Sequence, residues 1–233
     1  GSDVEQALNA SRQPDLEMLW KGLKSTIKDE NILVLCEADF IQKELKEAGI
    51  DAEIRPLPLD SGLYLPKPFP ATFTVGVYAP QGEQAADRYN IQFMFDIARS
   101  MPDVQFIFFG NNRPQEIGNV KFVGWLPIQE VIDQCSALIR ITSHDGLPIS
   151  PIEFILSGRP VITNVPMKYA EIVPIKEFNE DEYAMGRELI IQKLRGFEKN
   201  GYNKNDLAIN YYKDILDPQK FKDRMYAFLR EGK

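Results

Sequence analysis

The chain has 233 residues, of which 44% are hydrophobic and 26% are charged, and its formal net charge is -7. This is the composition of a globular protein with one large or two small domains. The negative charge argues against nucleic acid as a main partner, because phosphate backbones are bound by concentrated Lys and Arg. The single histidine argues against a zinc enzyme or a multi-histidine metal site, so we expect no metal.

The cysteines and the hydropathy pattern bear on the cellular compartment. Cys36 and Cys135 lie in apolar segments without the spacing of metal ligands, so we expect both to be reduced core residues. We find no apolar run of membrane-spanning length and no signal peptide. These features predict a cytoplasmic protein, with peripheral membrane association as the alternative.

The first third of the chain predicts two helices and two strands. Apolar residues at helical spacing indicate helices over 15–27 and 37–48. The apolar run 31–36 is typical of a buried parallel strand, and residues 50–57 indicate a second strand. The proline-rich stretch 66–70 is typical of a linker.

The remainder of the chain alternates strands and helices. This alternation predicts an α/β fold with a Rossmann-like, mostly parallel sheet flanked by helices. Residues 79–89 are expected to form a polar loop between a strand and a helix, but they contain no G-x-G-x-x-G. The expected strands are 72–78, 104–110 and 121–124, and the expected helices are 90–101, 127–135, 182–197, 206–216 and 218–229.

Residues 136–166 are predicted to form a strand, a loop, a helix, a turn and a strand. Residues 137–142 indicate a buried strand, and the next strand begins at 161. We expect the helix to begin near Ser150, a good N-cap, and to end at Gly158 in the left-handed conformation. In such a βαβ unit a ligand binds at the carboxyl end of the first strand.

Two carboxylates flank the start of this helix. Asp145 lies in the loop and Glu153 in the first helical turn. Between them, the Gly146 and Leu147 backbone and the helix N-terminus offer N–H groups and partial positive charge, which suit a phosphate. Glu153 can accept hydrogen bonds from ribose or hexose hydroxyls beside that phosphate. Taken singly, Asp145 could be a turn residue and Glu153 could serve the helix N-terminus.

The order of residues in this region resembles a known signature. D-G-L-P-I-S-P-I-E at 145–153, followed by S-G-R-P-V-I at 157–162, is similar to the E-G-F-x-L-S-x-x-E…G-x-P-V-V pattern of retaining glycosyltransferases with the GT-B fold. This family 4 type group contains glycogen synthases and many lipopolysaccharide sugar transferases. The resemblance covers roughly residues 31–173. It implies transfer of a sugar from a nucleoside diphosphate sugar with retention of configuration, with no metal and no separate cofactor.

The resemblance implies roles for the two carboxylates and for the diphosphate contacts. Asp145, where the family has Glu, would lie by the donor sugar, and Glu153 would bind the ribose hydroxyls. The family places an Arg just after the strand 72–78, where this sequence has none, and a Lys a few residues later, where Arg88 stands. We expect Arg88 to contact the diphosphate together with Gly146 and Leu147, the alternative being a solvated loop arginine.

Further donor contacts are implied near the middle of the chain. Gly110 ends the predicted strand 104–110, and Val123 and Trp125 lie in a turn that borders the nucleotide base in the family. We therefore expect these three residues at the base and ribose. His144, beside the loop carboxylate, is a candidate contact for the donor sugar, with a structural role as the alternative.

The resemblance also predicts a division of the chain. Residues 1–70 would be a remnant of the N-terminal lobe with its linker, and residues 71–233 the nucleotide-sugar-binding lobe of the C-terminal half. The expected partners are a nucleotide sugar, an acceptor glycan or lipid-linked glycan, and a missing N-terminal lobe, but not nucleic acid. Two alternatives stay open, namely a GT-B nucleotide-sugar epimerase and a truncated or degenerate lobe that binds nucleotide or a partner without turnover.

Overall fold

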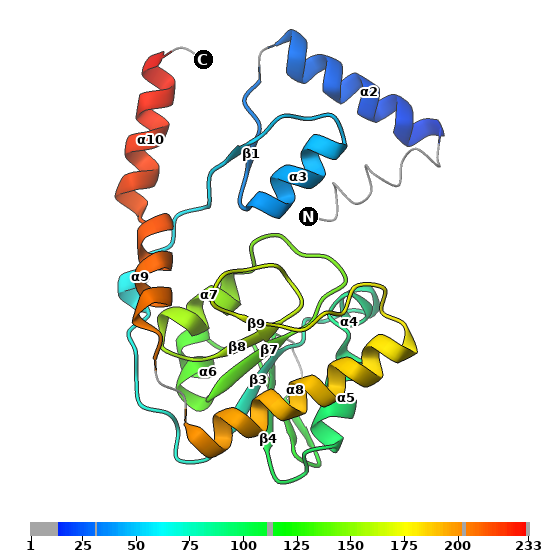
Figure 1. The fold of residues 1–233 in the computed structure, drawn as a ribbon, viewed down its shortest axis with the longest axis vertical. Helices are drawn as coiled ribbons and strands as arrows, with labels where there is room; N and C mark the ends of the chain where they lie inside the picture. The colour runs from blue at the N-terminus through cyan, green and yellow to red at the C-terminus, as the bar shows by residue number, and fades with distance from the viewer. Residues whose placement is uncertain (1–13, 31, 111–113, 202–203, 232–233) are drawn as a thin grey trace. The chain divides into compact units, whose positions relative to one another are not determined.

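The chain divides into two units (Figure 1). The computed structural model describes residues 14–30, 32–110, 114–201 and 204–231. Within these, the first unit takes residues up to 60, the short segment 144–147 and residues from 214 onward, and the second takes 61–143 and 148–213. These boundaries differ from the expected segments 1–70 and 71–233, because residues 61–70 belong to the second unit, and residues 144–147 and those from 214 onward belong to the first.

A buried arginine accounts for the placement of the linker. Arg159 donates from Nη1 to the carbonyl of Lys67 and from Nη2 to the carbonyl of Pro68, both at 2.8 Å. Its guanidinium carbon lies 4.8 Å from the ring centroid of Phe69. The stretch predicted as a linker is therefore fixed to the second unit by two charge-assisted hydrogen bonds and a cation–π contact.

The first unit holds a short parallel pair of strands. Its elements are α2 (Pro14–Asp29), β1 (Leu35–Cys36), α3 (Asp39–Glu47), β2 (Glu53–Ile54) and α10 (Pro218–Glu231). β1 and β2 align Leu35 with Glu53 and Cys36 with Ile54. Ile41 and Leu45, one turn apart on α3, are buried with Cys36. Both strands are much shorter than the predicted 31–36 and 50–57, and residue 31 lies outside the described residues.

The second unit is built on a seven-stranded sheet in the order β5-β6-β4-β3-β7-β8-β9. All neighbouring strands are parallel except β5 and β6. This confirms the predicted α/β fold with a mostly parallel sheet. The strands are β3 (Thr74–Tyr78), β4 (Gln105–Phe109), β5 (Gln115–Ile117), β6 (Val120–Gly124), β7 (Ala137–Arg140), β8 (Val161–Thr163) and β9 (Glu171–Ile172). β5 and β9 lie at the sheet edges and were not predicted, since their residues are exposed and lack an apolar run.

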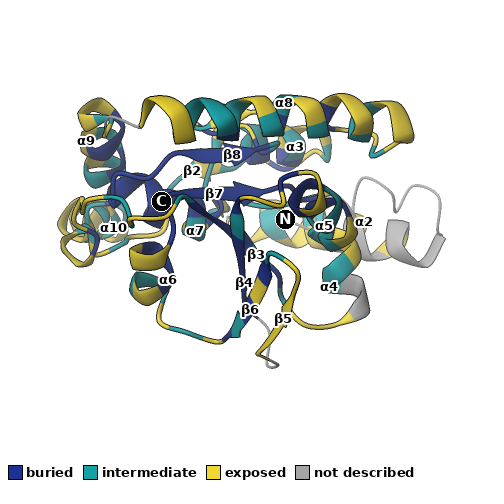
Figure 2. Cartoon of the chain, turned by 90° about the horizontal axis from the view of Figure 1, so that it is seen from below, coloured by how far each residue is buried: buried dark blue, intermediate teal, exposed yellow. Residues whose placement is uncertain are grey.

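Helices cover both faces of this sheet. Besides the short 3-10 helix η2 (Ser61–Leu63), they are α4 (Glu83–Arg88), α5 (Ile91–Arg99), α6 (Ile128–Gln134), α7 (Ile149–Leu156), α8 (Glu180–Asn200) and α9 (Asp206–Ile215). Figure 2 shows α8 along one face and α6 against the other. The core residues of α5 and α8 pack with Val75 and Val77 of β3. Between them, Gly76 faces the opposite layer, where an added Cβ would lie 3.1 Å from Cys135 Sγ and 3.3 Å from Phe154 Cζ.

Two local predictions are wrong. The expected polar loop 79–89 contains the helix α4. The helix after β7 begins at Ile149 with Pro148 as its N-cap, rather than with Ser150. Pro148 holds an extended conformation (φ -75°, ψ 123°), and the Ser150 hydroxyl accepts a hydrogen bond from Arg140 instead. The left-handed Gly158 is confirmed, with φ +74°. No helix in the described part of the chain is long and apolar enough to cross a membrane.

Candidate functional site

The topology of the large sheet singles out one place for a ligand. The chain passes from β3 to its neighbour β4 on one side, and later returns to β7 on the other side of β3. In parallel α/β sheets, ligands bind outside the carboxyl ends of the strands at such a switch point. The last residues of the two strands are Tyr78 and Arg140. The candidate site is therefore built around this pair.

Arg140 is a buried cation enclosed by aromatic rings. Its guanidinium carbon lies 5.0 Å from the ring centroid of Tyr78 and 4.9 Å from that of Tyr89. Nη1 donates to the hydroxyl of Ser150 at 2.9 Å, and Nη2 to the hydroxyl of Tyr89 at 3.3 Å. The two tyrosine rings meet edge to face, with centroids 5.2 Å apart. The switch point thus carries a positive charge whose position is fixed by three elements.

The glycine after β4 allows this arrangement. Gly110 has φ +98°, and an added Cβ would lie 2.7 Å from Cε2 of Tyr78. Its N–H donates to the carbonyl of Gly124 at 3.0 Å, which joins the carboxyl ends of β4 and β6. The predicted base-binding residues Gly110, Val123 and Trp125 therefore lie at one edge of the sheet. Val123 is half-buried, and 66% of the Trp125 surface is exposed.

Arg88 ends α4 next to Tyr89. Its carbonyl accepts a hydrogen bond from the N–H of Ser143 at 2.9 Å, so the end of α4 is attached to the segment that follows β7. The side chain itself is exposed. The fold brings Arg88 to the carboxyl edge of the sheet, and its contact with a diphosphate stays a prediction.

Glu153 is a buried carboxylate in a helix whose other buried residues are almost all apolar. Only 8% of its surface is exposed. The hydroxyl of Tyr64 donates to Glu153 Oε1 at 2.6 Å. Burial raises the pKa of Glu153, and the bond from Tyr64 offsets part of that rise. Ser150 and Glu153 are three residues apart on α7, so their side chains project from the same side of the helix.

The loop residues 144–147 belong to the first unit, whereas Glu153 belongs to the second. In the first unit, Nε2 of His144 lies 3.4 Å from Oε2 of Glu44 on α3. A Cβ on Gly146 would lie 3.1 Å from Oε2 of Glu37. Asp145 Oδ1 accepts from the N–H of Gly146 at 3.0 Å, the donor that the sequence offered to a phosphate. Leu147 completes the loop and is half-buried.

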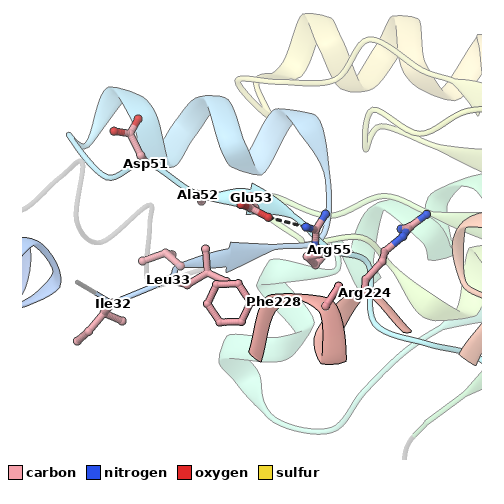
Figure 3. Close-up of a pocket in the computed structure, with 10 residues that line it drawn as sticks. Ile32, Leu33, Asp51, Ala52, Glu53, Arg55, Arg224 and Phe228 are labelled. Atoms are coloured by element: carbon pink, nitrogen blue, oxygen red, sulfur yellow. Dashed lines mark hydrogen bonds and ion pairs between the residues drawn. The ribbon is translucent and has the colours of Figure 1, made fainter. Parts of the chain in front are cut away.

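A separate hollow lies in the first unit (Figure 3). It has a volume of about 510 Å³ and lies between α10 and the residues that lead into β1 and β2. Glu53 and Arg55 form an ion pair of 2.6 Å on its wall, and Phe228 supplies an aromatic ring. None of the residues predicted to bind the donor lines this hollow. Within the described ranges, no group of three or more His, Cys, Asp and Glu side chains is arranged to hold a metal ion.

The roles of four side chains around these sites were not predicted from the sequence. They are Tyr64, Tyr89, Arg140 and Ser150 in its role as acceptor. One signal was present, because an arginine ends the otherwise apolar strand A-L-I-R. The contact of Tyr64 with Glu153 joins residues 89 positions apart, and no spacing rule predicts it.

The fold is similar to that of solved glycosyltransferases. It matches sucrose-phosphate synthase from Thermosynechococcus elongatus with a TM-score of 0.67 at 13% identity, over 85% of this chain and 58% of that one. It matches the lipopolysaccharide outer core galactosyltransferase WaaB with a TM-score of 0.57 at 16% identity, over 85% and 62% of the two chains. It also matches a variant of TarM from S. aureus, in complex with fondaparinux, α-GlcNAc-glycerol and UDP, with a TM-score of 0.56 at 14% identity, over 84% and 46%.

These matches establish a shared fold. No family model matches the sequence, and no curated protein matches it. The chain spans between 46% and 62% of the length of the three solved proteins.

Proposed function

We propose that this chain is the donor-binding part of a glycosyltransferase that transfers a sugar from a nucleoside diphosphate sugar to an acceptor hydroxyl with retention of configuration. The observation that carries the proposal is Glu153, a buried carboxylate one turn into the helix that follows the switch-point strand. A carboxylate is costly to bury, and such residues cluster at functional sites. The glycosyltransferase fold of the solved neighbours supports the same conclusion.

In this proposal the donor lies along the carboxyl edge of the large sheet. Glu153 accepts hydrogen bonds from the ribose hydroxyls, and Asp145 lies by the donor sugar. The bond between the sugar C1 and the phosphate oxygen breaks, with its electron pair passing to the diphosphate. The acceptor oxygen forms the new bond to C1 on the same face, and its proton passes to a phosphate oxygen. Charge that develops on the diphosphate is stabilised by positioned donors.

The other predicted contacts keep their roles in the proposal. Arg88, Gly146 and Leu147 bind the diphosphate. Gly110, Val123 and Trp125 border the base and ribose, and His144 is a candidate contact of the donor sugar.

The proposal assigns donor binding to residues 71–233. Residues 1–70 would then be part of an acceptor-binding lobe, the remainder of which would be the missing N-terminal partner. The acceptor would be a glycan or a lipid-linked glycan. The nucleotide sugar is the only small molecule required, so no separate cofactor enters. Both cysteines are buried free thiols, which supports a reducing compartment such as the cytoplasm.

A specific observation also favours a second candidate, a lobe that binds nucleotide or a partner without turnover. The Tyr64 hydroxyl already occupies Oε1 of Glu153, and both residues are buried. A ribose hydroxyl would have to share this oxygen or displace Tyr64. In that case the buried pair is a structural contact and the carboxylate is not offered to a donor.

Calorimetric titration of UDP, GDP and ADP into the protein and into Glu153→Gln tests whether Glu153 is offered to a donor, and a turnover assay then separates the two candidates. Gln keeps the size of the side chain but removes the charge. We expect one diphosphate to bind, and the variant to lose about tenfold or more in affinity, as for hydrogen bonds to a charged group. Glu188→Gln is the matched control, because Glu188 is exposed on α8.

Two results would contradict the donor-site assignment of Glu153. If none of the three diphosphates binds, or if Glu153→Gln binds as tightly as the natural protein, the donor-site assignment of Glu153 is wrong. Incubation of the natural protein with the matching nucleotide sugar and an acceptor, followed by NMR of the anomeric proton, tests turnover and retention.

A further inference from the structure

Residues 61–70, which we call the strap, bring a tyrosine into the second unit. The strap begins with η2, where the N–H of Tyr64 donates to the carbonyl of Ser61 at 3.2 Å. Around Tyr64 the usual order of burial is reversed, since Leu63 and Leu65 are each 59% exposed whereas Tyr64 is 5% exposed. Apolar side chains normally take the buried positions. The strap is therefore turned so that the tyrosine, and neither leucine, points inward.

Contacts with two helical segments of the same unit fix the strap. Besides the two hydrogen bonds from Arg159 to strap carbonyls, Lys67 Nζ pairs with Asp133 of α6 at 2.7 Å. An added Cβ on Gly158, in the turn after α7, would lie 3.4 Å from Cβ of Pro66, so the strap runs close to this turn. Arg159 is fully buried, and removing a partner from a buried charge is costly. These contacts hold the tyrosine of the strap at one place.

The Tyr64 hydroxyl holds one of the two oxygens of Glu153. It donates to Oε1 at 2.6 Å. In the described part of the chain no donor reaches Oε2, and this atom is not among the polar atoms that are closed off from solvent without a partner. An ionised carboxylate accepts hydrogen bonds through both oxygens. One oxygen is thus fixed, and the other can accept from a ligand.

Stability alone does not account for this buried pair. The other buried residues of α7 are apolar, and an apolar pair in place of a buried polar one is often neutral or stabilising. A carboxylate that is already held in one rotamer has an advantage in binding, because its ordering took place during folding. Burial raises the pKa of Glu153 and the bond from Tyr64 lowers it, so this bond favours the anion that accepts hydrogen bonds.

We propose that Tyr64 is a positioning residue, whose hydroxyl fixes the Glu153 carboxylate so that Oε2 accepts from a ribose hydroxyl and the site prefers ribonucleotides to their deoxy forms. The inference rests on the proposed function for the place of the ribose. It adds a residue of the strap, outside the βαβ unit that carries Glu153. Tyr64 acts through Glu153 and does not itself touch the donor. A ligand without the hydroxyl leaves the fixed carboxylate unsatisfied, which is the basis of the preference.

The test measures the preference for ribose hydroxyls. The diphosphate that binds among UDP, GDP and ADP is compared by calorimetry with its 2′-deoxy and 3′-deoxy forms, and the preference is the ratio of their Kd values. The variants are Tyr64→Phe, Glu153→Gln and the two combined. The matched control is Tyr212→Phe, because Tyr212 is also buried and its hydroxyl donates to the carbonyl of Lys168 at 2.8 Å.

We expect the natural protein to prefer the ribonucleotide to at least one deoxy form by about tenfold or more, as for hydrogen bonds to a charged group. Tyr64→Phe should weaken binding of the ribonucleotide by about tenfold, the cost of ordering a glutamate side chain. Binding of that deoxy form should stay within about twofold, the usual limit of additivity. In the Glu153→Gln background, Tyr64→Phe should also change binding by no more than about twofold. Tyr212→Phe should keep the natural preference.

Folding of the variants is checked by circular dichroism and thermal unfolding. If Tyr64→Phe does not fold, Arg159→Lys tests the same step, because lysine lacks the fork of donors that reaches both strap carbonyls. Arg159→Lys should lower the preference for the ribonucleotide, and an unchanged preference in the folded variant would overturn the inference.

The outcomes separate this inference from the proposed function. If a diphosphate binds and Tyr64→Phe keeps the natural preference, Tyr64 is only a structural contact, and the proposed function stands. If Tyr64→Phe weakens the ribonucleotide and the deoxy forms equally, the inference is again wrong. If the natural protein binds a diphosphate without any preference for ribose hydroxyls, the inference and the role of Glu153 both fail. If no nucleoside diphosphate binds, the proposed function fails and the inference fails with it.

Discussion

The two units of this protein contain similar strand sequences but very different sheets. N-I-L-V-L-C at 31–36 and V-Q-F-I-F-F at 104–109 are both apolar runs. The second run forms β4, whose last four residues are buried between two neighbouring strands. The first yields only the two-residue β1, with 38% of Leu35 exposed. Parallel strands are stable when both faces and both edges are covered. An apolar run therefore becomes a full strand only where neighbours complete it.

The largest expected difference between the two units is in the stability lost when a core side chain is truncated to alanine. Phe108 is fully buried, and its ring centroid lies 5.0 Å from that of Phe95 and 5.2 Å from that of Phe122. Phe108→Ala should lower the free energy of unfolding by about 3–5 kcal/mol. Ile41→Ala in the first unit should cost about 2 kcal/mol, the low end for this change, because the small core around it can relax. Urea denaturation followed by circular dichroism measures both losses.

An exposed leucine provides the control for this comparison. Leu207 is 71% exposed, and Leu207→Ala should change the free energy of unfolding by no more than about 0.5 kcal/mol. A loss for Ile41→Ala as large as that for Phe108→Ala would show that the first unit is as well packed as the second, contrary to the comparison.

Two glycines test whether the switch point is tightly packed. Gly110 and Gly118 both have positive φ, +98° and +59°, but only Gly110 faces a neighbour that an added Cβ would strike. Gly118→Ala should cost about 1 kcal/mol from its left-handed backbone. Gly110→Ala should cost more, since it must also displace the Tyr78 ring from Arg140. Thermal unfolding of the two variants gives the difference, and equal shifts in Tm would mean that Tyr78 moves aside freely.

The smallest expected effect is the change of stability with pH that arises from the protonation of Glu153. Burial raises the pKa of Glu153 in the folded state, so the folded protein binds more protons than the unfolded chain at pH values between the unfolded and folded pKa values. The contribution of protonated Glu153 to the free energy of unfolding is complete below the unfolded pKa, and it is lost as pH rises through the folded pKa. Glu153→Gln should therefore remove this decrease of stability with rising pH.

The measurement is thermal unfolding between pH 4 and 8, an interval chosen to include the usual carboxylate pKa of about 4.3 and values above it. The Tm difference between Glu153→Gln and the natural protein should become more favourable to the variant as pH rises. Tyr64→Phe removes the hydrogen-bond donor that lowers the pKa of Glu153, so the decrease of stability should move to higher pH in this variant. A Tm difference that does not vary with pH would contradict the raised pKa.

Much of the second unit follows from sequence spacing. The helices 90–101 and 127–135 were located to within two residues of α5 and α6, because their apolar residues recur at the helical period. The left-handed Gly158 was placed correctly, since it follows the last apolar turn and precedes a proline. The start of α7 was wrong because the Ser150 hydroxyl has a tertiary partner, Arg140, that competes with capping.

The sequence by itself determined the α/β class, the mostly parallel sheet and the loop that carries Asp145, since these depend on local periodicity and turn chemistry. Only the tertiary structure decided which side chains meet at the switch point and which partner Glu153 takes. Arg140 and Tyr89 are brought together by the order of the strands, and Tyr64 by the path of a segment far away in the chain. Burial and contacts between distant residues depend on packing, which no local pattern encodes.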